Sequence, residues 1–159
     1  MVDTDSNNCI CCEAPAEDVR KTFRFLEREE IEELCPYLEL REWPTGAEIM
    51  LEGSVEDYMG FIVEGKLAVK KKTGFWEKQI VIAILEKGSM VGEGALIDSG
   101  PRSSSVTAME PCKLLTLSTR KMDELTINDP QLAIKLLKRM LHIISVRLGK
   151  AVERISELL

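Results

Sequence analysis

Eight short segments rich in aliphatic residues, separated by turn residues, occupy the middle of this 159-residue sequence. The segments span residues 37–43, 48–51, 58–64, 66–71, 79–85, 90–91, 103–108 and 113–117. Turn signals lie between them, for example Pro44-Thr45-Gly46 and Gly100-Pro101. This spacing predicts a mainly β fold, an eight-stranded antiparallel β-roll or jelly-roll barrel with flanking helices. A barrel of this size is expected to enclose a small ligand cavity rather than to present a flat binding face.

Short helices are expected on both sides of the barrel. Residues 16–35 carry apolar side chains at helical spacing, and the charged Arg28-Glu29-Glu30 predicts a break between two short helices. Residues 119–125 predict another short helix, which Ser118 or Thr119 can cap at its N-terminus.

A long helix is expected to begin at Asn128-Asp129-Pro130, where a capping side chain is followed by proline. Its first apolar stripe suits packing on the barrel and consists of Leu132, Leu136, Met140 and Ile143. A second stripe alternates spacings of four and three residues and consists of Leu137, Leu141, Ile144, Leu148, Ala151, Ile155 and Leu158. Such a seam typically pairs with another helix, so we expect a homodimer through it. The alternative is a helix that only lies along its own barrel.

The N-terminal residues are polar and contain three clustered cysteines, Cys9, Cys11 and Cys12. Cysteine ligands of metals typically come as spaced pairs, whereas Cys11 and Cys12 are adjacent, so we expect no metal site there. The role of these cysteines stays open. We therefore expect three regions: a flexible cysteine-containing tail over 1–15, a barrel with short helices over 16–129, and a long lid or dimerisation helix over 130–159.

Charge is distributed unevenly along the chain. The formal net charge is −6, and residues 1–35 hold ten acidic and four basic side chains, while the remainder holds seventeen of each. The chain therefore lacks the basic footprint of a nucleic-acid-binding protein. No apolar run approaches the roughly 20 residues of a membrane helix, and the first residues do not form a secretion signal. A cytoplasmic location is expected.

The stretch from Val91 to Val106 combines the groups that bind a phosphorylated sugar. A Gly-x-Gly turn offers backbone N–H groups that form an anion-binding concavity. Arg102 can grip a phosphate through two parallel hydrogen bonds. Glu93 cannot hold a phosphate, but its carboxylate can accept hydrogen bonds from sugar hydroxyls. Phosphate and sugar together indicate a nucleotide ligand.

This stretch resembles the phosphate-binding cassette of the cyclic nucleotide-binding domain family, which includes catabolite activator proteins and protein kinase A regulatory subunits. The matching residues are Gly92, Glu93, Ala95, Leu96, Pro101, Arg102, Ser103, Ser104, Ser105 and Val106. Val91 replaces the usual Phe of the family, and Gly94 replaces the usual Leu or Ile. The turns at Thr45–Ile49 and in the hairpin over 52–67 also resemble the family. The resemblance spans roughly residues 20–150.

The resemblance implies a role for each matching side chain. Arg102 is expected to hold the exocyclic phosphate, and Glu93 the ribose 2′-hydroxyl, although Glu93 could instead pair with Arg102. The expected ligand-binding residues are Gly92, Glu93, Gly94, Ala95, Leu96, Arg102, Ser103, Ser104 and Arg147. In this list Gly94, Ala95 and Ser103 offer backbone N–H groups. Arg147, on the long helix, would stack on the purine, or else be a solvated arginine.

The ligand implied by the resemblance is cAMP or cGMP. Ser103 matches neither of the family's usual base-specific residues, so the choice between the two stays open, with cAMP favoured. We expect a regulatory sensor rather than an enzyme, because the sequence holds one histidine, His142, and no nucleophile–base pair. The family's transcription factors carry a helix-turn-helix after the long helix, and this sequence has none, so DNA binding is not expected. The alternatives are a ligand-free dimerisation scaffold and the sensor fragment of a transcription regulator. The downstream partner protein stays unknown.

Overall fold

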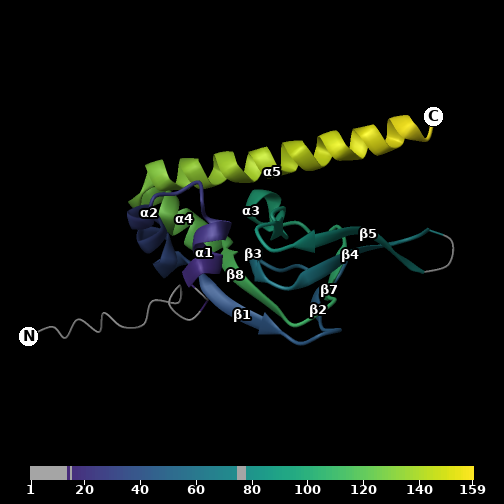
Figure 1. Ribbon diagram of the computed structural model, residues 1–159, viewed down its shortest axis with the longest axis horizontal. Coiled ribbons are helices and arrows are strands. Elements are labelled where there is room, and N and C mark those ends of the chain that lie inside the picture. The colour runs from purple at the N-terminus through teal and green to yellow at the C-terminus, as the bar shows by residue number, and fades with distance from the viewer. Residues whose placement is uncertain (1–13, 15, 75–77) are drawn as a thin grey trace, which may run out of the picture.

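Two four-stranded antiparallel sheets face one another and form the predicted β-roll (Figure 1). The computed structural model describes residues 14, 16–74 and 78–159. One sheet has the order β1-β8-β3-β6 and the other β2-β7-β4-β5. The strands are β1 (Glu39–Trp43), β2 (Glu48–Met50), β3 (Tyr58–Glu64), β4 (Lys66–Lys72), β5 (Gln79–Glu86), β6 (Met90–Val91), β7 (Ser105–Ala108) and β8 (Cys112–Ser118).

Gly65 carries the chain from one sheet to the other between β3 and β4. Its φ of +90° lies in the left-handed region, where side chains are strained. A Cβ atom there would also lie 2.5 Å from the carbonyl oxygen of Pro111 and 2.6 Å from Sγ of Cys112. Only glycine fits this crossing without a local shift of the backbone.

Two predicted strands begin later than the sequence indicates. Residues Cys35–Tyr37 form a short 3₁₀ helix that contains Pro36, so β1 begins at Glu39 rather than at residue 37. β7 begins at Ser105 rather than at residue 103. The residues before Ser105 belong to a loop, because the backbone N–H of Arg102 donates to the carbonyl oxygen of Ser54 at 2.8 Å.

The predicted break at Arg28-Glu29-Glu30 is wrong. Helices α1 (Ala16–Thr22) and α2 (Arg28–Leu34) are separated by residues 23–27, and the charged triplet forms the first turn of α2. A capping box explains this start, since the backbone N–H of Glu27 donates to Oε2 of Glu30 at 2.9 Å.

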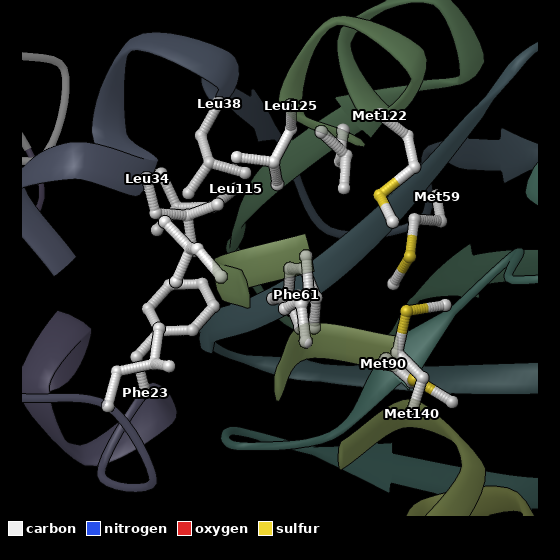
Figure 2. Close-up of a cluster of buried hydrophobic side chains, with 14 of the residues drawn as sticks. Phe23, Leu34, Leu38, Met59, Phe61, Met90, Leu115, Met122, Leu125 and Met140 are labelled. Carbon is white, nitrogen blue, oxygen red and sulfur yellow. The ribbon is translucent and has the colours of Figure 1, made fainter. Parts of the chain in front are cut away.

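The apolar core has two parts. The larger lies where α1, α2, α4 (Thr119–Asn128) and the start of α5 (Pro130–Glu157) cover one end of the β-roll (Figure 2). There the Phe23 and Phe61 rings meet edge to face, with centroids 5.0 Å apart. The smaller lies between the sheets and includes Ile49, Ile62 and Leu114. The larger part fixes where α5 starts on the β-roll.

Helix α5 runs along the β-roll and continues on the side where β4 and β5 lie (Figure 1). Asp129 caps it, since its Oδ1 accepts from the N–H of Leu132 at 3.0 Å. In the first predicted stripe, Leu132, Leu136 and Met140 are buried and Ile143 packs against the core. The second stripe is largely exposed, with Leu141 and Leu148 at 66% and 63%.

Short α3 (Ala95–Asp98) lies between α5 and the β-roll and ends at Ser99, whose φ is +52° (Figure 1). Within residues 14, 16–74 and 78–159, no helix is long and apolar enough to span a membrane. The clustered cysteines Cys9, Cys11 and Cys12 lie outside the described residues.

Candidate functional site

A cavity of about 400 Å³ lies between the β-roll and α5. Eight of the nine predicted ligand-binding residues line it: Gly92, Glu93, Gly94, Ala95, Arg102, Ser103, Ser104 and Arg147. The ninth, Leu96, is not among the lining residues, because its side chain packs against the larger core cluster. The structure thus brings together groups that the sequence separates by up to 55 positions.

One wall of the cavity is apolar, and its residues were not predicted from the sequence as part of the site. It consists of Met50, Val69, Leu85 and Val106, which lie on four strands of one sheet. Ile144 from α5 faces the same space. Strand alternation could have indicated these residues, since side chains two apart share a face. The cavity therefore has a polar side and an apolar side, as a nucleotide with a purine base requires.

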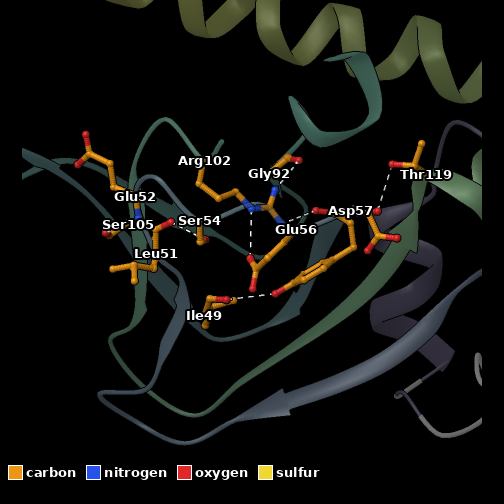
Figure 3. A network of polar contacts seen from close by, with 11 residues as sticks. Ile49, Leu51, Glu52, Ser54, Glu56, Asp57, Gly92, Arg102, Ser105 and Thr119 are labelled. Carbon is orange, nitrogen blue, oxygen red and sulfur yellow. Dashed lines mark hydrogen bonds and ion pairs between the residues drawn. The ribbon is translucent and has the colours of Figure 1, made fainter. Parts of the chain in front are cut away.

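Arg102 is held by three partners inside the protein (Figure 3). Its Nη2 donates to the carbonyl oxygen of Tyr58 at 2.7 Å, and its Nη1 to that of Gly92 at 3.1 Å. Its Nε donates to Oε2 of Glu56 at 3.2 Å, which is also an ion pair. Arg102 is only 7% exposed. The guanidinium is thus fixed in position at the cavity wall, with one carboxylate supplying its countercharge.

The ring of Tyr58 contacts two guanidinium groups. The Cζ of Arg102 is 5.0 Å from the ring centroid and that of Arg41 is 4.6 Å away. Such cation–π contacts favour a fixed ring and fixed guanidinium groups. The Tyr58 hydroxyl donates to the carbonyl oxygen of Ile49 at 3.1 Å, and burial raises the pKa of Tyr58. Neither Glu56 nor Tyr58 was predicted from the sequence as part of the site.

Gly92, rather than Gly94, is the glycine that the turn requires. Gly92 has φ of +75°, and a Cβ atom there would lie 2.6 Å from Cε of Met50 and 2.7 Å from Nη1 of Arg102. Gly94 has φ of −56° and open space around it. The departure of Gly94 from the family pattern therefore removes a side chain without any backbone requirement for glycine.

Glu93 pairs with Arg147 and not with Arg102. Oε1 of Glu93 is 3.5 Å from Nη1 of Arg147. Nη2 of Arg147 also donates to Oγ of Ser89 at 2.6 Å and to the carbonyl oxygen of Met90 at 2.5 Å. The predicted alternative of a Glu93–Arg102 pair is therefore not observed, because Glu56 is the carboxylate nearest to Arg102. Three bonds connect α5 directly to the edge of the cavity.

The backbone of the predicted cradle is only partly free. The N–H of Ala95 donates to the carbonyl oxygen of Gly92 at 3.2 Å, within the turn that leads into α3. The carbonyl oxygen of Ser103 accepts from Nζ of Lys71. Lys71 also pairs with Glu52 at 2.7 Å, and this pairing lowers the pKa of Glu52. A loop that is bonded on both sides of Arg102 holds that side chain at one place along the cavity.

A family model for the cyclic nucleotide-binding domain matches residues 40–129, which run from β1 to the end of α4 and include the whole cassette. The chain belongs to the cyclic nucleotide-binding domain family. The resemblance noted in the sequence is confirmed, and so is the predicted fold.

Three similar proteins illustrate the relationship. The chain is 30% identical over 95 residues to the cyclic AMP receptor protein of Thermus thermophilus, covering 60% of this chain and 44% of that protein. It is 34% identical over 110 residues to a cyclic nucleotide-gated potassium channel of Rhizobium etli, covering 69% of this chain and 29% of the channel. A cyclic nucleotide-binding domain from Methylobacillus flagellatus has a TM-score of 0.83 and 26% identity, covering 90% of this chain and 85% of that structure.

The chain spans less than half of the length of the receptor protein and of the channel. By name, one of these relatives is a receptor for cyclic AMP and the other is a potassium channel gated by cyclic nucleotides. The family therefore supports a binding domain with a regulatory role.

Proposed function

We propose that this domain binds a cyclic nucleotide, with cAMP favoured over cGMP, and acts as a regulatory sensor. The observation that carries the proposal is the joint placement of Arg102, Glu93 and Arg147 on one cavity of about 400 Å³. The cAMP preference rests on relatives named for this nucleotide, such as the Thermus receptor protein.

In the proposed complex, Arg102 binds the exocyclic phosphate and Glu93 accepts from the ribose 2′-hydroxyl. The phosphate replaces Glu56 as the main countercharge of Arg102, since both anions need the same guanidinium. The hydroxyls of Ser103 and Ser104 add donors, and the apolar wall with Ile144 accommodates the purine.

Ligand binding is proposed to act on α5 through Arg147. A ribose hydroxyl that occupies Glu93 competes with the ion pair between Glu93 and Arg147, so the contacts that hold α5 at the cavity change. The size of this shift is limited by the difference in ligand affinity between the two helix positions. We propose residues 16–129 as the binding unit and 130–159 as the reporting helix.

The exposed stripe of α5 favours a homodimer. Leu141, Leu148, Ile155 and Leu158 of this stripe are more than half exposed, whereas Leu137 is 45% exposed and Ile144 is partly buried. A 3.5-residue repeat of this kind pairs with an equivalent helix. We therefore propose that two copies of the chain associate through this stripe in the cytoplasm, where a nucleotide signal would reach them.

Isothermal titration calorimetry with cAMP and with cGMP tests the proposal. We expect cAMP to bind, with tighter binding than cGMP, and to raise the unfolding temperature. Arg102→Ala should weaken binding about 100-fold or more, since a charge-assisted phosphate contact is lost. Arg147→Ala should have a much smaller effect, because only Arg102 meets the phosphate charge.

The alternative is a dimerisation scaffold that binds no ligand. That alternative would be favoured if neither nucleotide gave a heat of binding and neither raised the unfolding temperature. If Arg102→Ala and Arg147→Ala weakened nucleotide binding equally, the phosphate would instead lie elsewhere in the cavity.

A further inference from the structure

A second, larger groove of about 690 Å³ separates β5 from the C-terminal half of α5. Its floor is apolar. Ile82 and Ile84 come from β5, and Ile143 and Val146 from the facing side of α5. Ile84 is 54% exposed although it lies in the middle of an apolar strand sequence. The groove therefore leaves uncovered an apolar surface that the chain itself does not bury.

The rim of this groove is strongly basic. Arg24, Arg139, Lys150 and Arg154 line it, and within the described part of the chain none of the four makes an ion pair. Among the described lining residues, Glu86 is the one acidic side chain, and it is paired with Lys66. On a chain with net charge −6, this is a local concentration of unneutralised positive charge.

We propose that this groove, called the β5–α5 groove below, docks an acidic amphipathic helix of a partner protein. The basic rim matches acidic side chains on the flanks of such a helix, and the apolar floor matches its apolar stripe. From Arg139 to Arg154 the groove extends roughly 22 Å along α5, enough for about four helical turns.

Other anionic partners fit the β5–α5 groove less well. Single-stranded nucleic acids are held by aromatic side chains on which bases stack, whereas among the described residues of the groove lining His142 is the one aromatic ring. A membrane surface would need the basic and apolar groups on a convex face, whereas Ile82 and Val146 lie inside a concavity.

The β5–α5 groove and the nucleotide cavity share two lining residues, Leu85 and Arg147. If Glu93 turns to a ribose, the guanidinium of Arg147 loses its carboxylate partner and adds positive charge at the groove. Partner docking should then be tighter in the presence of cyclic nucleotide, and by linkage the partner should tighten nucleotide binding equally. This coupling rests on the proposed function, whereas docking itself does not.

Fluorescence anisotropy with a synthetic helical peptide tests docking without any nucleotide. The probe is a labelled peptide of about 18 residues, long enough to fill the groove. It carries Leu at positions i, i+3, i+4 and i+7, with Glu on the flanks. Two control peptides have Lys in place of Glu, or the same composition in scrambled order.

We expect the acidic amphipathic peptide to bind and both control peptides to bind at least tenfold more weakly. Lys150→Glu with Arg154→Glu should weaken probe binding about tenfold or more, since two attractive charges become repulsive. The matched control, Lys138→Glu with Arg120→Glu, changes the net charge equally at exposed positions outside the groove, and should bind as the wild type does. Circular dichroism checks that both double variants fold.

Equal probe binding by the wild type and Lys150→Glu/Arg154→Glu would overturn the proposal. Equal binding of the scrambled peptide would also overturn it, because only net charge would then matter. Phosphatidylserine vesicles or a DNA duplex that bind tighter than the probe, with the same loss in the variant, would assign the groove to those partners instead. A changed sedimentation coefficient of the variant would assign it to an interface between copies.

The coupling is tested separately with saturating cAMP. We expect at least threefold tighter probe binding in the wild type and no change in Arg102→Ala. Probe binding that is unaffected by cAMP would remove the coupling while leaving docking supported. If calorimetry shows no binding of cAMP, the proposed function is contradicted. The docking proposal would then still be decided by the binding of the peptide probe.

Discussion

Glu56→Gln should make the protein less stable and yet improve its nucleotide binding. Glu56 supplies the only carboxylate that the described residues place against Arg102, the arginine proposed to bind phosphate. The variant keeps an oxygen that can accept from Nε of Arg102 but loses the negative charge. In the absence of nucleotide, a buried guanidinium is then left without countercharge.

The magnitude follows from the geometry of this ion pair. Arg102 Nε and Glu56 Oε2 are 3.2 Å apart, with 5% of the Arg102 side chain and 36% of the Glu56 side chain exposed. Because the carboxylate reaches water, its loss should cost less than the ~3–5 kcal/mol of a fully buried pair. We expect the free energy of unfolding to fall by about 2 kcal/mol, within the range for charge-assisted hydrogen bonds.

Bound nucleotide should offset part of this loss. The phosphate brings its own negative charge to Arg102, so the complex needs Glu56 less than the free protein does. If about 1 kcal/mol of the loss is recovered on binding, the dissociation constant for cAMP falls about fivefold.

Urea unfolding and calorimetry with cAMP measure the two effects. The matched control is Glu52→Gln, since Glu52 belongs to the same connection before β3 but pairs with Lys71 and does not contact Arg102. We expect that control to bind cAMP as the wild type does. The reasoning would be refuted by Glu56→Gln having unchanged stability, or by weaker cAMP binding in that variant.

Three further variants probe the turn, the exposed stripe of α5 and the core. Gly92→Ala should lower the free energy of unfolding by about 2–3 kcal/mol, because Gly92 has a positive φ and a Cβ atom there would make close contacts. Gly94→Ala should change the free energy of unfolding by less than about 0.5 kcal/mol. Equal urea midpoints of the two variants would contradict this. Leu141→Asp with Leu148→Asp should give a monomer by sedimentation, and an unchanged profile would remove the proposed dimer. Phe61→Ala, at a residue 2% exposed, should cost about 3–5 kcal/mol in urea unfolding; a loss below about 1 kcal/mol would show that the core repacks around it.

Most of the fold could be predicted because the local signals agree with the tertiary structure. Turn residues and apolar runs place the eight strands within two residues, and Asp129 with Pro130 marks the start of α5. The errors lie where short-range patterns compete. The triplet after Glu27 looked like a helix break, but a capping box makes it a helix start.

The site could be predicted only in part. The cassette residues are contiguous in sequence, so Glu93 and Arg102 could be assigned together. Glu56 is 46 positions before Arg102, and no pattern connects the two, because their contact depends on how the loop before β3 folds back on the cassette. The same is true of the pairing between Glu93 and Arg147, which forms only when α5 packs on the β-roll.

The anchoring of α5 at Arg147 has a mechanical consequence. From Arg147 to Glu157 the helix continues for ten more residues, or roughly 15 Å at the rise of an α-helix. A helix of this length behaves as a stiff lever whose pivot is the edge of the cavity. A tilt of about 10° at the pivot would displace the far end by roughly 2.6 Å. A change in the contacts of Arg147 that tilts the helix by this amount would move its far end enough to separate packed side chains.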